Sequence, residues 1–229
     1  MRSALVGALL LAATASQASA QVSFSSQTGA PDPGYGSQQL LVNFNNLNPG
    51  SYPGIAFSGN YAILAGSVSG AAAPAGVNTG FFAVPNPNGN VNGTAVIDFS
   101  GFLASKSLKS LSFYWGSIDG YNSLRLLDAA GNAIAMNIGS GTGTVLTGTH
   151  VIAQANGNQT APSTNRRLFL DLSTTPTFAK LELTSNGRAF EIDDIAGEMA
   201  TVPEPTSVAL LGAGLVGLAG VARRRSRRS

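Results

Sequence analysis

Short runs of alternating apolar and polar residues constrain the fold of this chain more than any other feature. Leu111, Phe113 and Trp115 share one parity, and Ser110, Ser112 and Tyr114 take the other, as a half-buried strand requires. Turns rich in Gly and Asn separate the runs, and no segment shows a 3.6-residue period with helix caps. The pattern predicts an all-β protein with a single β-sandwich, jelly-roll-like domain. The expected strands are residues 39–44, 94–99, 107–115, 123–127, 133–138, 167–172, 178–183 and 189–195.

One predicted turn is specific enough to give a pairing. Residues 128–132 (DAAGN) separate the runs at 124–127 and 133–138. Gly131 can take a positive φ at low cost, so the segment favours a hairpin. We therefore expect the two runs to pair.

The two ends of the chain differ from the body in charge. Arg2 and five arginines after residue 222 account for six of the 13 basic residues, which leaves seven basic residues against ten acidic residues in the body. The body is therefore mildly acidic, and the whole-chain pI of 9.2 gives no support for nucleic-acid binding. The chain also has no cysteine, so about 180 residues must fold around an ordinary core without disulfides.

The N-terminus has the three parts of a secretory signal peptide. Met1 and Arg2 form a positive region, residues 4–13 are apolar, and Ala18 and Ala20 form a small-x-small cleavage site. Signal peptidase is the expected partner, and the mature protein should begin near Gln21.

The C-terminus has the parts of a membrane-associated sorting tail. Pro203, Glu204 and Pro205 precede residues 206–222, which carry no charge and would form a helix of about 26 Å. The basic tail at 223–229 should stay in the cytoplasm, with the body outside it. Glycines at 212, 214, 217 and 220 fit either close packing on a partner helix or a marginal, easily released anchor. The basic residues that would stop transfer are Arg223, Arg224 and Arg225, followed by Arg227 and Arg228.

This tail resembles the PEP-CTERM sorting signal of exosortase-dependent surface proteins of Gram-negative bacteria. The resemblance implies recognition of Pro203, Glu204 and Pro205 by an exosortase, a membrane-embedded cysteine transpeptidase. It implies an exported precursor anchored in the inner membrane, followed by release to the cell surface or outside the cell. Residues 113–122 resemble a signature of one subgroup of these proteins, which brings no defined activity. The expected organisation is a signal peptide at 1–20, a sandwich at 21–198, a linker at 199–205, a transmembrane helix at 206–222 and a basic tail at 223–229.

Two aromatic residues are candidates for glycan contact. Trp115 lies at a predicted strand end and Tyr121 in the loop that follows, where both rings could stack on a sugar. The alternative is that both complete the core, which is the usual role of large aromatics at strand ends.

Three aspartates are candidates for a calcium site. Phe190 and Ile192 share a parity that Ile195 breaks, which predicts a bulge near Asp193 or Asp194. Those carboxylates, together with Asp119, could ligate Ca²⁺. The alternative is an acidic, solvent-facing strand end.

Catalytic motifs are scarce in this sequence. His150 is the single histidine, cysteine is absent, and no G-x-S-x-G stands between a strand and a helix, so a triad or thiol mechanism is not expected.

Two functional hypotheses remain. The first is a non-enzymatic structural or adhesive protein of the envelope, the extracellular matrix or the exopolysaccharide of a biofilm. The second is a Ca²⁺-dependent carbohydrate-binding module or a two-carboxylate glycoside hydrolase.

Overall fold

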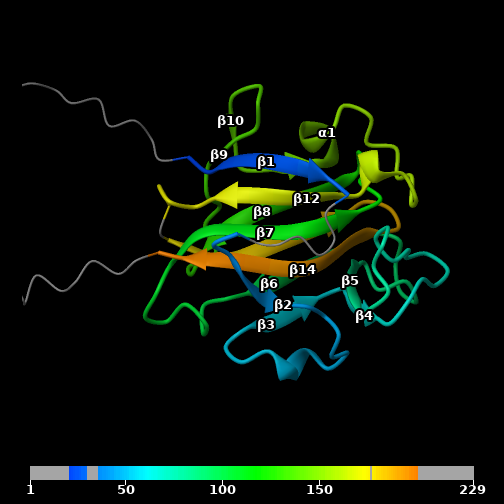
Figure 1. Cartoon of the computed structure of the whole chain (residues 1–229), viewed down its shortest axis with the longest axis horizontal. Coiled ribbons are helices and arrows are strands. Elements are labelled where there is room, and N and C mark those ends of the chain that lie inside the picture. Colours follow the sequence, from blue (N-terminus) through cyan, green and yellow to red (C-terminus); the bar gives the residue numbers. More distant parts are fainter. Residues whose placement is uncertain (1–20, 30–35, 176, 201–229) are drawn as a thin grey trace, which may run out of the picture.

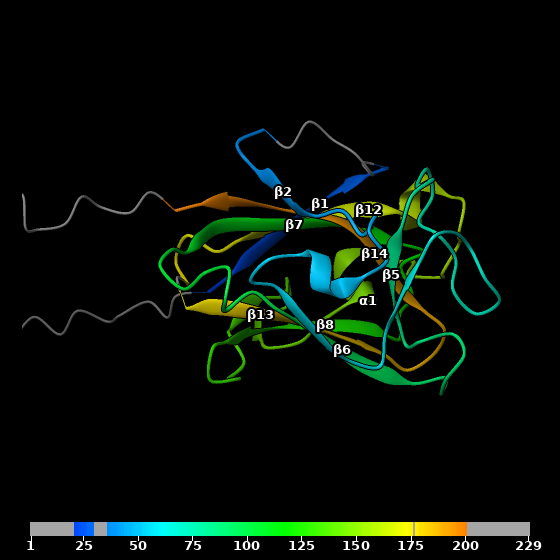
Figure 2. The ribbon, with the colours of Figure 1, turned by 90° about the horizontal axis from the view of Figure 1, so that it is seen from below.

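The computed structural model describes residues 21–29, 36–175 and 177–200. Most of its strands form two antiparallel sheets that pack face to face, as Figures 1 and 2 show. The predicted sandwich is confirmed. The predicted signal peptide, sorting motif, transmembrane helix and basic tail lie outside the described residues. Within those residues no helix is long and apolar enough to cross a membrane.

The first sheet has the order β1-β12-β7-β14-β5-β4, and β2 also pairs with β14. The second has the order β11-β8-β13-β6-β3, and β9 and β10 form a small ribbon. The strands are β1 Ser23–Thr28, β2 Gln39–Val42, β3 Ala56–Gly59, β4 Ala62–Leu64, β5 Phe81–Val84, β6 Gly93–Asp98, β7 Leu108–Gly116, β8 Asn122–Asp128, β9 Met136–Asn137, β10 Thr142–Gly143, β11 Leu146–Thr147, β12 Arg166–Asp171, β13 Phe178–Ser185 and β14 Phe190–Met199. The helical elements are α1 Gly148–Val151 and the 3₁₀ turns η1 Pro49–Ser51 and η2 Pro162–Thr164.

Alternation places the core between the sheets, because successive side chains of a strand point to opposite faces. Leu111, Phe113 and Trp115 of β7 are fully buried, and Leu181 and Leu183 of β13 are buried on the facing sheet. The chain crosses between the sheets from β6 to β7 to β8, and again from β12 to β13 to β14. Each sheet therefore contributes one wall of a shared core.

The predicted hairpin after β8 is only partly formed. Gly131 has a φ of +90°, as expected, and the amide of Asp128 bonds to the carbonyl of Asn132. The second run, however, pairs with β8 through a single bridge, between Leu127 and Ala133. It then leaves to bond with Val22 instead, so most of the strand predicted at 133–138 is absent and only β9 remains.

Buried polar side chains on the outer face of the first sheet hold the loop at residues 67–77 against it. Glu191 accepts hydrogen bonds from the amide of Ala72 (3.0 Å) and the hydroxyl of Ser117 (2.7 Å). Asn165 accepts from the amide of Ala75 (2.9 Å), and the Tyr114 hydroxyl donates to the Ala75 carbonyl (2.8 Å). The loop therefore covers one half of this outer face and leaves the other half for the site described below.

Candidate functional site

A groove of about 480 Å³ lies on the outer face of the first sheet, beside the half that the loop at 67–77 covers. Strand pairing creates it, because Ser25 lies opposite Phe169 and Phe169 opposite Ser112 across β1, β12 and β7. The next outward-facing positions along these strands form a second row, which extends across four strands and consists of Ser23, Asp171, Ser110 and Glu198. The lining residues are Ser23, Phe24, Ser25, Gly36, Ser37, Gln38, Ser110, Phe169, Leu170, Asp171 and Glu198.

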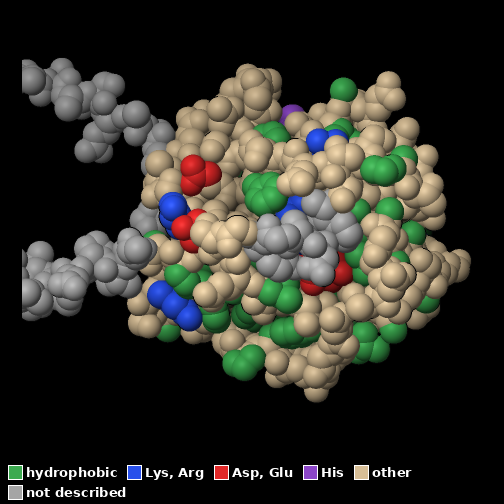
Figure 3. All heavy atoms as spheres, in the orientation of Figure 1, with side chains coloured by type: hydrophobic (Ala, Val, Ile, Leu, Met, Phe, Trp, Pro, Cys, Tyr) green, Lys and Arg blue, Asp and Glu red, His purple; other side chains and the backbone are tan. Residues whose placement is uncertain are grey.

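Phe169 is the outward-facing aromatic residue of this groove. Its neighbours in β12, Leu168 and Leu170, point into the core and are buried, whereas Phe169 is only partly buried. Figure 3 shows this face of the molecule, where hydrophobic side chains reach the surface among mostly polar surroundings. The groove therefore offers an apolar ring within a polar rim.

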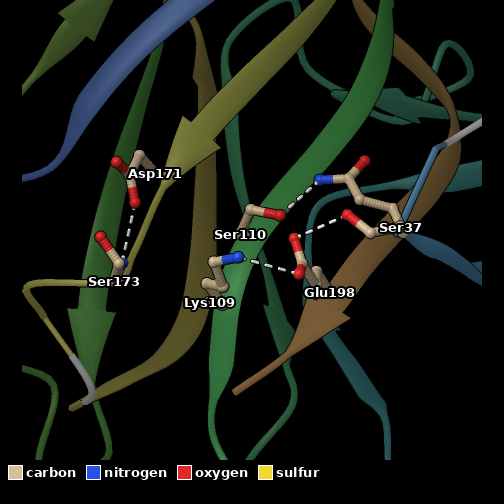
Figure 4. A network of polar contacts seen from close by, with 7 residues as sticks. Ser37, Lys109, Ser110, Asp171, Ser173 and Glu198 are labelled. Carbon is tan, nitrogen blue, oxygen red and sulfur yellow. Dashed lines mark hydrogen bonds and ion pairs between the residues drawn. The ribbon is translucent and has the colours of Figure 1, made fainter. Parts of the chain in front are cut away.

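The rim on the β14 side is held by a network of polar contacts, shown in Figure 4. Glu198 accepts from the ammonium of Lys109 (3.0 Å) and from the hydroxyl of Ser37 (2.8 Å). Gln38 donates to Ser110 (2.8 Å) and accepts from the Ser112 hydroxyl (2.6 Å). These bonds fix the rim, while Ser23 and Ser25 are exposed and make no side-chain hydrogen bond within the described residues.

Both carboxyl groups of the groove are held in the charged form. The hydrogen bond from Lys109, with that from Ser37, lowers the pKa of Glu198. Hydrogen bonds from Ser173 lower the pKa of Asp171, which turns toward Ser173 in Figure 4. A glycosidase needs one carboxyl group whose pKa is raised so that it can donate a proton. Neither carboxyl group of the groove has such a raised pKa.

The structure places Trp115 in the core. Its side chain is fully buried and stacks on Phe190 with ring centroids 4.2 Å apart. Tyr121 is 38% exposed, but its hydroxyl donates to the carbonyl of Arg188 (2.9 Å) and its ring lies against Gly187. The two rings do not form a common surface, so this geometry favours the core alternative for Trp115.

The three candidate calcium ligands are not assembled into a site. The register between β14 and β7 shifts between Asp193 and Ala196, which confirms the predicted bulge, and Asp194 takes a φ of +46° there. Asp193 is buried opposite Tyr114, whereas Asp119 lies beyond the far end of β7, beside Gly157. Within the part of the chain that the structure describes, no three His, Cys, Asp or Glu side chains form a group that could hold a metal ion.

Sequence reasoning missed the groove because no local pattern marks it. Its contributors come from β1, β7, β12 and β14 and from residues 36–38, and only strand pairing brings them together. The outward parity of Phe169 between two inward leucines is the single signal that could have pointed to it.

Comparison with known proteins locates a sorting signal at the end of the chain. A family model described as the PEP-CTERM protein-sorting motif matches residues 201–228. The chain therefore carries a PEP-CTERM sorting motif, in agreement with the resemblance seen in the sequence, and this motif implies an exported protein sorted to the cell surface by an exosortase.

No curated protein is significantly similar to the chain. The crystal structure of the enzymatically active domain of tailspike protein 4 from bacteriophage CBA120 matches with 15% identity and a TM-score of 0.33, over 69% of this chain and 22% of that one. A match at this TM-score supports no argument about fold or function.

Proposed function

We propose that this protein is a non-enzymatic adhesive or structural component of the cell envelope or extracellular matrix, and that it contacts extracellular polysaccharide through the outer-face groove. The sorting motif at residues 201–228 carries the proposal, because it directs the body to the place where such polymers are found. Signal peptidase, the inner membrane and an exosortase act on the precursor.

The groove supports the polysaccharide contact by its chemistry. A partly exposed phenyl ring can pack against the apolar face of a sugar, while hydroxyl, amide and carboxylate groups around it can bond to sugar hydroxyls. Phe169 supplies the ring, Ser23 and Ser25 supply hydroxyl groups, Gln38 supplies the amide and Asp171 the carboxylate. An open groove across strands also suits a polymer chain better than an enclosed pocket would.

The two alternative functions, a Ca²⁺-dependent carbohydrate-binding module and a glycoside hydrolase, have less support from the geometry. Asp119, Asp193 and Asp194 do not converge on one point, and both groove carboxyl groups have lowered pKa values. Binding through the groove needs neither a metal nor a proton donor.

The proposal is tested by measuring how the body binds exopolysaccharide purified from the strain that makes this protein. We expect Phe169→Leu, which keeps an apolar side chain but removes the ring, to weaken retention on immobilised polymer about tenfold, equivalent to about 1.4 kcal/mol. Phe169→Tyr keeps the ring and should bind as wild type does. Tyr121→Leu is the matched control at the other aromatic candidate and should leave retention unchanged. Equal retention of Phe169→Leu and wild type would exclude the groove as the contact.

A further inference from the structure

Both ends of the described body lie at one pole of the sandwich. The amide of Ala200 donates to the carbonyl of Ser107 (2.9 Å), and the hydroxyl of Thr174 donates to the carbonyl of Gln21 (3.1 Å). A further bond, from the amide of Leu172 to the carbonyl of Lys109 (2.9 Å), joins these two places. Figures 1 and 2 show both ends leaving from the same side. We call this surface the exit pole. It consists of Gln21, the turns at 99–107 and 172–175, and Ala200.

The last strand of the body runs almost to the sorting motif. β14 pairs with β7 as far as Met199, opposite Leu108, and Ala200 adds one more hydrogen bond. Only residues 201 and 202 separate Ala200 from Pro203. Three Cα–Cα steps of about 3.8 Å reach about 11 Å at most. The folded body is therefore tethered within about 11 Å of the motif.

Residues at the end of β14 can lengthen this tether only if they detach from the sheet, which costs free energy. β14 pairs with β7 as far as Met199 and, on its other side, with β2 as far as Gly197. Each residue that is pulled out therefore breaks ladder bonds to β7, and residues from Gly197 inward also break the bonds to β2. Ile195 and Ala196 are fully buried, and Gly197 lies against the side chains of Leu108 and Leu41. Freeing four or five residues would expose this packing to water.

We propose that the exosortase processes this protein with the body folded and the exit pole held directly against the enzyme, so that the exit pole is a contact surface for the exosortase. This inference rests on the proposed sorting. The opposite pole, beyond Gly116, is about 27 Å further away along β7, and groups attached there stay clear of the enzyme.

The absence of cysteine makes a direct test possible, because a single introduced cysteine gives a unique attachment site. Ser105→Cys lies in the exposed turn of the exit pole, and Gln159→Cys is exposed at the opposite pole. Each precursor is labelled with a maleimide-linked polyethylene glycol of about 5 kDa and incorporated with the exosortase into lipid vesicles. Cleavage is followed by the change in mass.

The polyethylene glycol on Ser105→Cys should slow cleavage about tenfold or more. The same label on Gln159→Cys should leave the rate of cleavage within about twofold of that of the unlabelled precursor. An insertion of about twelve Gly and Ser residues between Ala200 and Thr201, which adds a mean reach of about 20 Å, should restore cleavage of labelled Ser105→Cys. Equal rates for the two labelled variants, or no rescue by the insertion, would overturn the proposed contact. If the unlabelled precursor is not cleaved by the exosortase at all, the proposed sorting fails and this inference fails with it.

Discussion

Glu191 should make the stability of the body depend strongly on pH. Its side chain is 2% exposed, and burial raises its pKa to about 8 from an ordinary value of 4.5, although hydrogen bonds from Ser117 and the Ala72 amide act against this. The folded state therefore holds this proton more tightly than the unfolded state. The resulting stabilisation is complete below about pH 4.5 and is lost as the pH rises to about 8.

The size of the effect follows from the same values. At 1.36 kcal/mol per pH unit, the free energy of unfolding of the wild-type body should fall by about 4 kcal/mol between pH 5 and pH 9. Glu191→Gln keeps a neutral side chain of the same shape, so it should match wild type at pH 5 and retain most of its stability at pH 9. Burial also raises the pKa of Asp119, so a smaller decline should remain in the variant.

Urea unfolding at pH 5, 7 and 9 measures this directly. Trp115 is the single tryptophan and is fully buried against Phe190, so its fluorescence reports loss of the core. Glu182→Gln removes a charge from the surface pair with Arg125 and is the matched control, expected to keep the wild-type decline. The reasoning is refuted if Glu191→Gln and wild type lose the same free energy between pH 5 and pH 9.

Four further outcomes follow from the structure. Trp115→Ala should cost about 3–5 kcal/mol of unfolding free energy because it empties a buried site, yet a variant stabilised enough to fold should still bind polymer in the retention assay. Gly131→Ala should cost about 1 kcal/mol in urea unfolding, since its φ of +90° is strained for alanine although no atom lies within 4 Å of the added Cβ. Treatment with EDTA should leave both polymer binding and the thermal midpoint unchanged, because Asp119, Asp193 and Asp194 form no metal-holding group. Stability should also decline below about pH 4, because Asp128, Asp171 and Glu198 have lowered pKa values and stabilise the fold only while charged; acid titration of the tryptophan fluorescence measures this.

Alternation predicted the central strands well because their chemistry is local. β7, β12 and β14 each direct one parity of apolar side chains into the core, and the parity break after Ile192 correctly placed the bulge before Ala196. β1 and β5 were not predicted, because Ser23–Thr28 has little apolar alternation and Phe81–Val84 is buried on both faces. The second face of β5 is buried by Ala71 and Ala73 of the loop at 67–77, together with Leu64 and Ala189.

The candidate site was harder to predict because it depends on which strands become neighbours. An aromatic residue at a strand end is compatible with either a binding surface or a core, and only the packing of Phe190 on Trp115 decides between them. Phe169 and Ser25 are far apart in the sequence and become groove neighbours through the pairing of β1 with β12. Local sequence patterns contain no information of that kind.

The intact mass of the protein recovered from the envelope and the medium tests the central claim most directly, with wild type compared with a strain that lacks its exosortase. We predict a species that begins near Gln21 and ends near Pro203–Pro205 only where the exosortase is present. A mass that retains Arg223–Arg228 in both strains would contradict sorting by an exosortase and would leave a body tethered to the membrane.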